Sequence, residues 1–184
     1  MATIDSLRTG ITPLDRAARA VDRLTALLSA LGTALILAVM LLIAVDVAGR
    51  FFFGHPIAGV PEMVAMSILA IVFLQIANTT AQGKLTRSDA LLGALHTRHP
   101  RLAEGFDALL HLAGAVLLGI LTSAFWPQFL RSFGRNEMVG TVGQFLAPIW
   151  PVHGIVVLGA ALMTLVFALR ALLLAIRAVR GMPA

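Results

Sequence analysis

Long stretches without a charged residue decide what this chain can fold into. No Asp, Glu, Lys or Arg lies between Arg23 and Asp46, or between Glu62 and Lys84. The first stretch, 24–45, would reach about 33 Å as a helix at about 1.5 Å per residue, which is enough to cross the hydrocarbon of a bilayer. Hydrophobic residues fill 59% of the 184 positions and charged residues 12%, which leaves too little polar surface for a soluble domain. We therefore expect an integral membrane protein.

Two further apolar stretches follow, and the four together predict a single membrane domain. The predicted fold class is an all-α integral membrane protein with four transmembrane helices and with amphipathic surface helices at the N-terminus and in mid-chain. The predicted spans are residues 24–46, 61–83, 102–130 and 150–174. They belong to a four-helix membrane domain at 24–180, which lies between an amphipathic N-terminal segment at 1–23 and a tail at 181–184.

The polar segments between the spans are less regular. Near the N-terminus one helical face is apolar and another is basic. The apolar face holds Leu14, Ala18, Val21 and Leu24, and the basic face holds Arg16, Arg19 and Arg23. This pattern fits a helix on the membrane surface or an ordinary solvated helix end. After the second span, Ser88 is a candidate cap for a second surface helix.

Near the third and fourth spans, proline and glycine set the expectations. Trp126-Pro127 is expected to kink the third span near its end, because proline removes a helical hydrogen bond. The glycine-rich segment 131–151 is expected to be a loop.

The basic residues predict the orientation. Eleven of the fourteen Lys and Arg lie in the N-terminal segment, the connector after the second span and the C-terminal end, where the last three are Arg170, Arg177 and Arg180. The positive-inside rule then places both termini in the cytoplasm and the stretch 46–62 on the outer face, which is the periplasm if the cell is Gram-negative. No basic stripe alternates with aromatic residues, so we expect contacts with anionic lipid headgroups and none with nucleic acid.

The junction between the first two spans holds a candidate charge cluster. Asp46 and Arg50 lie four residues apart, which is one helical turn, and Glu62 returns at the start of the second span. These three side chains are predicted to form a structural cluster at the outer face. The alternative is that they are separate, solvated interfacial charges.

Enzyme chemistry finds little support in the sequence. The chain has no cysteine, and no nucleophile, base and acid fall at one membrane depth. His111 and His153 could suggest haem, but the predicted topology separates them in depth by roughly 20 Å. We therefore expect no enzyme, no catalytic residue, no metal site and no cofactor in this chain. Because its spans show neither internal repeats nor midplane breaks, a transport site is expected in a partner subunit.

The motifs of the chain resemble those of the small membrane subunit of tripartite ATP-independent periplasmic (TRAP) transporters, the DctQ-like family. The first junction matches in order and spacing at Asp46, Val47, Arg50, Phe53, Pro56, Gly59 and Glu62. A second motif matches at Arg87 and Asp89, although Leu85 and Ser88 depart from it, and a third matches at Pro148 and Trp150.

This resemblance implies a non-enzymatic small permease subunit in the bacterial inner membrane. Its partners would be a large multi-span subunit, which binds the substrate and the coupling sodium, and a periplasmic binding protein that delivers an organic anion. The small subunit would act as scaffold and anchor. Arg50, Arg131 and Arg135 are candidate docking residues for the binding protein. Two alternatives stay open, the membrane anchor of a haem-containing respiratory enzyme and a stand-alone small channel or exporter.

Overall fold

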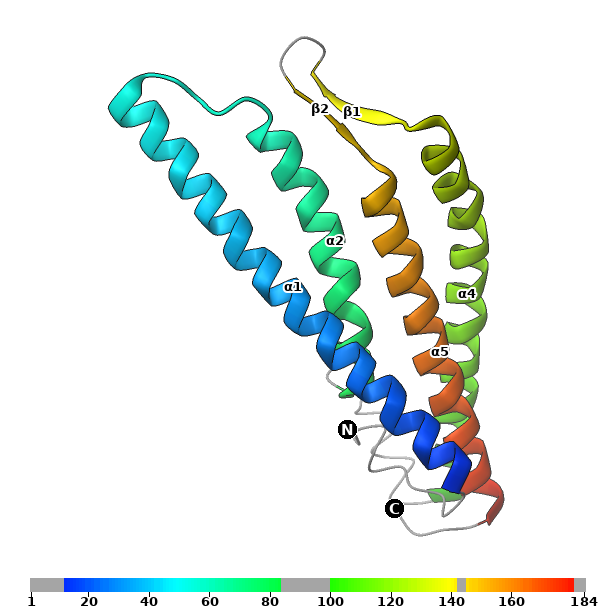
Figure 1. Cartoon of the computed structure of the whole chain (residues 1–184). Helices are drawn as coiled ribbons and strands as arrows, with labels where there is room; N and C mark the ends of the chain where they lie inside the picture. Colours follow the sequence, from blue (N-terminus) through cyan, green and yellow to red (C-terminus); the bar gives the residue numbers. More distant parts are fainter. Residues whose placement is uncertain (1–11, 84–99, 142–144, 181–184) are drawn as a thin grey trace.

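The computed structural model describes residues 12–83, 100–141 and 145–180, and within these ranges four helices and one short hairpin form (Figure 1). The helices are α1 (Thr12–Phe53), α2 (Val60–Ala81), α4 (Pro100–Arg135) and α5 (Trp150–Arg180). All four are long and apolar enough to cross a membrane, which confirms the predicted fold class. The predicted mid-chain surface helix and the tail at 181–184 lie outside the described residues.

Helix α1 joins the first span and the basic segment before it into one rod. Its 42 residues reach about 63 Å at about 1.5 Å per residue, roughly twice the thickness of a bilayer's hydrocarbon. The sequence left open whether the segment before Arg23 is a helix on the membrane surface or a solvated helix end. Nothing at positions 20–26 breaks a helix, because neither glycine nor proline occurs there, so the basic turns continue directly into the span.

The start of α2 is set by local backbone chemistry. Gly59 precedes the helix with φ of 83°, a left-handed conformation that glycine adopts at no steric cost. Pro61 then occupies the first turn, where its missing N–H costs no hydrogen bond, and Glu62 lies near the positive end of the helix dipole.

The glycine-rich segment after the third span forms a β-hairpin, which corrects the expectation of a loop. Strands β1 (Met138–Thr141) and β2 (Phe145–Pro148) pair in antiparallel register, with Val139 opposite Ala147. The β-branched residues Val139 and Thr141 favour an extended chain. Gly140 has no side chain to obstruct the partner strand, whose Phe145 carbonyl lies against it. Helix α4 also continues through Pro127 to Arg135, beyond the predicted end of the third span.

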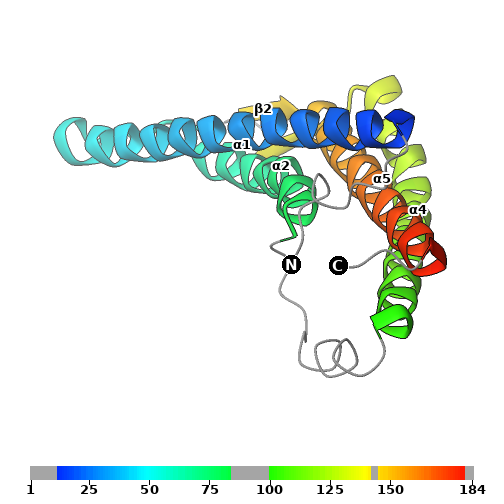
Figure 2. The same ribbon diagram turned by 90° about the horizontal axis from the view of Figure 1, so that it is seen from below.

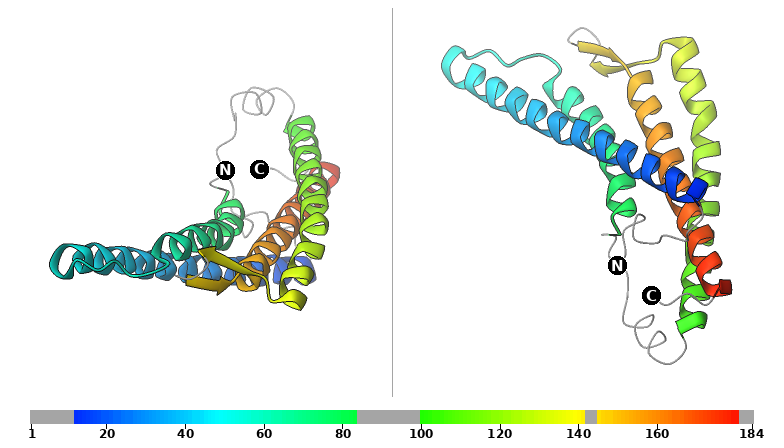
Figure 3. Two further views of the ribbon diagram at one scale, coloured as in Figure 1. Left: turned by 90° about the horizontal axis from the view of Figure 1, so that it is seen from above. Right: turned by 60° about the horizontal axis from the view of Figure 1, so that its bottom comes forward.

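The helices form two layers that meet at an angle (Figures 2 and 3). One layer contains α1 and α2, and the other contains α4 and α5. Helix α5 packs against α4 most extensively and also contacts α2 and α1, so it is the centre of the fold. The loop after α1 and the hairpin lie at one end of the molecule, and the first turn of α1 and the last turn of α5 lie at the other (Figure 1).

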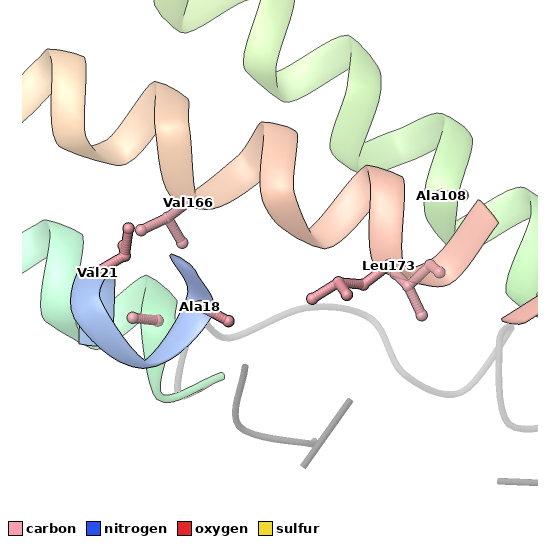
Figure 4. Close-up of a cluster of buried hydrophobic side chains, with 7 residues drawn as sticks. Ala18, Val21, Ala108, Val166 and Leu173 are labelled. Carbon is pink, nitrogen blue, oxygen red and sulfur yellow. The ribbon is translucent and has the colours of Figure 1, made fainter. Parts of the chain in front are cut away.

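All four helices meet in one buried cluster near the end where α1 begins and α5 ends (Figure 4). Its members are Ala18 and Val21 of α1, Ala81 of α2, Ala108 of α4, and Val166, Leu173 and Leu174 of α5. Three of the seven are alanines, one each on α1, α2 and α4, and such small residues let helix backbones approach closely, as is typical of helix packing in membranes. From this cluster α1 diverges from α5 toward the opposite end of the molecule (Figure 1).

Burial along α1 follows a narrow seam. The covered positions are spaced alternately by three and four residues, and almost all residues between them are exposed. These covered residues are Ala18, Val21, Thr25, Leu28, Gly32, Leu35, Val39, Leu42, Asp46 and Gly49. This heptad spacing is that of a helix that touches its neighbours along one line, as in a coiled coil.

Candidate functional site

Asp46 is the centre of the contacts at the junction between α1 and α2. It is 4% exposed, and one carboxylate oxygen accepts from Arg50, with Nη2 at 2.7 Å and Nε at 3.0 Å. The other oxygen accepts the backbone N–H of Ile57 at 2.8 Å. The carboxylate therefore fixes the last turns of α1 and the loop that follows them. Charge-assisted bonds of this kind are stronger than neutral ones.

Glu62 lies across the same junction. It and Arg50 line one open pocket of about 530 Å³, whose walls are the loop residues from Pro56 to Gly59 together with Pro61. The Arg50 side chain is 54% exposed, so one side of it faces the buried Asp46 and the other faces outward. The pocket is shallow and polar, and it is a surface feature of the loop end of the molecule.

The two connections at the loop end of the molecule, the α1–α2 loop and the hairpin, are joined by an aromatic contact. The ring of Phe145, at the start of β2, lies directly on Gly59, so that a side chain at position 59 would overlap the ring. Gly59 is thus required twice, for its positive φ and for the absence of a Cβ. This contact links the α1–α2 loop to the hairpin between α4 and α5.

A polar network fixes the base of the hairpin. The buried Ser132 hydroxyl lies 2.7 Å from His153 Nδ1, 2.9 Å from Glu137 Oε2 and 2.9 Å from the Gln128 carbonyl oxygen. The Gln128 carbonyl and the Glu137 carboxylate can only accept, so they share the single proton of the hydroxyl. The hydroxyl oxygen then has no proton left for His153, and the Nδ1–H of His153 donates to it. The Glu137 backbone also donates to the Ser132 carbonyl and accepts from Ile149.

The serine, histidine and carboxylate do not form a catalytic triad. In a triad the histidine bridges the nucleophile and the acid, whereas here Ser132 bridges His153 and Glu137. The network instead joins α4, the hairpin and α5 at their common end.

His111 lies at the other end of α4. Its ring is 2% exposed, it contacts Asp107 one turn earlier with Nδ1 at 3.3 Å from the carboxylate, and it packs on Phe167. His111 and His153 therefore have separate sets of neighbours near opposite ends of antiparallel helices. Within the described ranges, no group of three His, Cys, Asp or Glu could hold a metal ion.

Arg170 has a position that its sequence context did not reveal. We counted it among the charges at the C-terminal end, but it is 2% exposed and lies inside the fold. Its Nη2 donates to the Ala81 carbonyl at 3.1 Å. The last carbonyls of a helix lack partners within the helix, and a cation there also meets the negative end of the dipole. Arg170 of α5 therefore caps α2.

The remaining predicted residues fall into four groups. Val47 and Phe53 are exposed on α1, at 58% and 78%. Arg131 and Arg135 are exposed at the end of α4, on the same end of the molecule as Arg50. Pro148 ends β2, and Trp150 begins α5 with its ring 5.4 Å from that of Phe133. Arg87 and Asp89 lie outside the described residues.

Sequence reasoning missed Phe145, Ser132, Glu137 and the role of Arg170. The first three lie in the segment that we expected to be an irregular loop. The sequence did contain one signal, since Arg170 is the one charged residue within the predicted span 150–174. An arginine inside a span is costly unless protein surrounds it, so this position indicated a buried cation.

The comparisons with known proteins agree with the resemblance found in the motifs. No curated protein and no solved structure matches the chain. Residues 39–178 match the family described as "Tripartite ATP-independent periplasmic transporters, DctQ component". This match covers more than half of the chain and includes the whole junction from Asp46 to Glu62, the hairpin and most of α5. The chain belongs to the DctQ component family of tripartite ATP-independent periplasmic transporters.

Proposed function

We propose that this chain is the fixed scaffold of a sodium-coupled importer of organic anions, with both termini in the cytoplasm. Family membership makes it a small, non-enzymatic transport component in the inner membrane, with several membrane-spanning helices. The proposed partners are a large subunit that binds substrate and sodium, and a periplasmic binding protein. This chain would need no cofactor of its own.

The uncovered surface of α1 supports the scaffold role most directly. In the apolar 18-residue stretch of α1, only 6% is buried within the chain. In the corresponding stretch of α5, 44% is buried. Leu37, Met40 and Leu41 are more than half exposed in the middle of α1. An apolar face of this length is available to a second membrane subunit as well as to lipid.

The loop end of the molecule supports a docking role. Arg50, Arg131 and Arg135 present exposed guanidinium groups there, and arginine suits bidentate contacts with carboxylates of a partner protein. The contacts of Asp46, Gly59 and Ser132 hold the loop and the hairpin that follow the helix ends on which these groups lie. We propose that this end of the molecule faces the periplasm and that the pairing of Asp46, Arg50 and Glu62 shapes it.

Co-purification in a mild detergent from the native membrane tests the scaffold proposal. We expect one large multi-span protein to accompany the chain, identified by mass spectrometry. Recovery of the chain as a lone monomer would contradict the proposal. As a second arm, liposomes that contain this chain alone should show no substrate flux, since the transport site is proposed to lie in the partner.

An Arg50→Ala variant tests the junction. It removes the partner of Asp46 and an exposed docking group, so we expect uptake to fall by about tenfold or more, since paired and buried charges are costly to separate. Substrate affinity of the isolated binding protein should stay unchanged. Arg50→Lys is the matched control, because it keeps the charge but loses the paired Nε and Nη2 donors to the Asp46 oxygen. Normal assembly and uptake by Arg50→Ala would end the proposal for this cluster.

A further inference from the structure

The first turns of α1 present a basic face that the scaffold role does not use. Arg16, Arg19 and Arg23 are exposed and, with Ala20, line a pocket of about 290 Å³. At 100° per residue, positions 16 and 23 lie within about 20° of each other, and position 19 lies about 60° away. The three guanidinium groups therefore point from one side of the helix.

The opposite side of the same turns is fixed by packing. Ala18, Val21 and Thr25 are at most 8% exposed, and the first two belong to the cluster shared by all four helices (Figure 4). Because α5 and its neighbours hold this side, the helix cannot rotate about its axis. The basic face is therefore held outward, away from the protein.

An apolar stripe continues directly from the basic face. Leu27 and Leu31 lie about 20° and 60° from Arg16 around the helix axis. They are 65% and 60% exposed, and Leu24 beside them is 45% exposed. The stripe begins with Leu27, one turn beyond Arg23 and inside the uncharged run 24–45. Basic groups followed along the same face by exposed leucines match the two parts of a lipid, its headgroup and its acyl chains.

We propose that Arg16 and Arg23, with Arg19 beside them, form a binding site for one anionic phospholipid. The phosphate would lie among the guanidinium groups, and an acyl chain would lie along Leu27 and Leu31. The continuous apolar stripe favours a lipid over a free phosphate ion, which would use only the arginines. The site does not depend on the proposed partners, since its residues all come from α1.

The test is a lipid titration of the full-length chain in detergent, followed by native mass spectrometry. Dioleoyl phosphatidylglycerol and dioleoyl phosphatidylcholine are the two probes. We expect the first phosphatidylglycerol to bind on the order of tenfold more tightly than phosphatidylcholine, as basic side chains near a membrane surface attract anionic lipid. An Arg16→Gln/Arg23→Gln variant should lose this preference. Arg131→Gln/Arg135→Gln removes two exposed arginines from the other end and should keep it.

Three outcomes would overturn the proposal. The first is an unchanged preference in Arg16→Gln/Arg23→Gln. The second is displacement of phosphatidylglycerol by glycerol 3-phosphate at equal concentration, which would indicate a simple anion site. The third is loss of the preference when the large subunit is bound, which would show that protein covers this face. If no large subunit co-purifies, the scaffold proposal fails, but the titration of the single chain still tests the lipid site.

Discussion

Helices α1 and α5 have similar composition but opposite relations to the rest of the chain. Helix α5 contacts every other helix, and its buried residues lie on more than one side, for example Val157 and Leu173 on nearly opposite sides. Helix α1 is longer but touches the rest of the chain along one seam. Its apolar 18-residue stretch is 6% buried, whereas that of α5 is 44% buried. Hydropathy alone would have treated the two as equivalent spans. The comparison separates a helix that holds this chain together from one that is turned toward its surroundings.

Small residues explain much of this difference. Where α5 crosses α2, Gly159 brings the backbones so close that a Cβ there would lie 2.4 Å from the Phe73 carbonyl oxygen. Without a hydrophobic driving force inside a bilayer, such close packing is a main source of helix association. On α1 the comparable position is Gly32, where a Cβ would meet the flexible side chain of Gln75 at 2.9 Å.

The largest effect is expected from Gly159→Val. The added side chain would overlap the α2 backbone, which cannot move aside without separating the helices, so we expect a loss of about 3 kcal/mol in the free energy of unfolding. Thermal unfolding of the purified chain in detergent measures it. Gly105→Val is the control, because no atom lies within 4 Å of a Cβ at that helical position. Equal stability of the two variants would contradict the idea that close packing at Gly159 holds α5 against α2.

A pair of leucine truncations compares α5 and α1 directly. Leu173 is 1% exposed and Leu27 is 65% exposed. We expect Leu173→Ala to cost about 2 kcal/mol through the cavity that it leaves, and Leu27→Ala to cost under about 0.5 kcal/mol. The same unfolding measurement applies to both. A larger loss for Leu27→Ala would mean that α1 is covered within the isolated chain after all.

Asp46 is the one buried carboxylate on the seam of α1, and its removal should act locally. In Asp46→Ala the Ile57 N–H loses its acceptor, and the loss of this partly buried hydrogen bond costs about 1 kcal/mol. Hydrogen exchange at the Ile57 amide should accelerate accordingly. Asp46→Asn keeps an oxygen at this position and should protect the amide partly. Unchanged exchange in Asp46→Ala would show that the loop is held by other contacts.

The smallest effect is expected at the polar contact between α1 and α2. Gln75 Nε2 donates to the Thr33 hydroxyl at 3.4 Å, which is a long hydrogen bond. Bonds of this type inside membrane proteins contribute about 0.6 kcal/mol. A double-mutant cycle with Gln75→Leu and Thr33→Val should therefore give a coupling energy near this value. A coupling above about 1.5 kcal/mol would mean that the seam of α1 is stronger than its burial indicates.

The sequence alone predicted the parts of the fold that depend on local rules. Four spans follow from hydropathy, the start of α2 follows from Pro61 and Glu62, and the proximity of Asp46 and Arg50 follows from helical spacing. Contacts between distant segments were not predictable in this way. Phe145 meets Gly59, and Arg170 meets Ala81, only because of how the layers pack, and no local pattern encodes that arrangement.

The hairpin and the continuity of α1 were missed for different reasons. Segment 138–148 contains strand-forming residues, but each strand has only four residues. Over so few positions the alternation of apolar and polar residues is too short to identify a strand. In α1, the change from amphipathic to apolar character at Arg23 suggested a boundary between two elements. Helix continuity depends on the absence of a breaker, and a change of composition does not end a helix.

The contact between Phe145 and Gly59 has a consequence for the order of folding. Each helical pair, α1 with α2 and α4 with α5, can form from neighbouring sequence as it enters the membrane. The ring of Phe145 can reach Gly59 only after both pairs are inserted and docked, since the two residues lie 86 positions apart in the sequence. We expect this contact to be among the last to form during biogenesis, so it would mark completion of the fold.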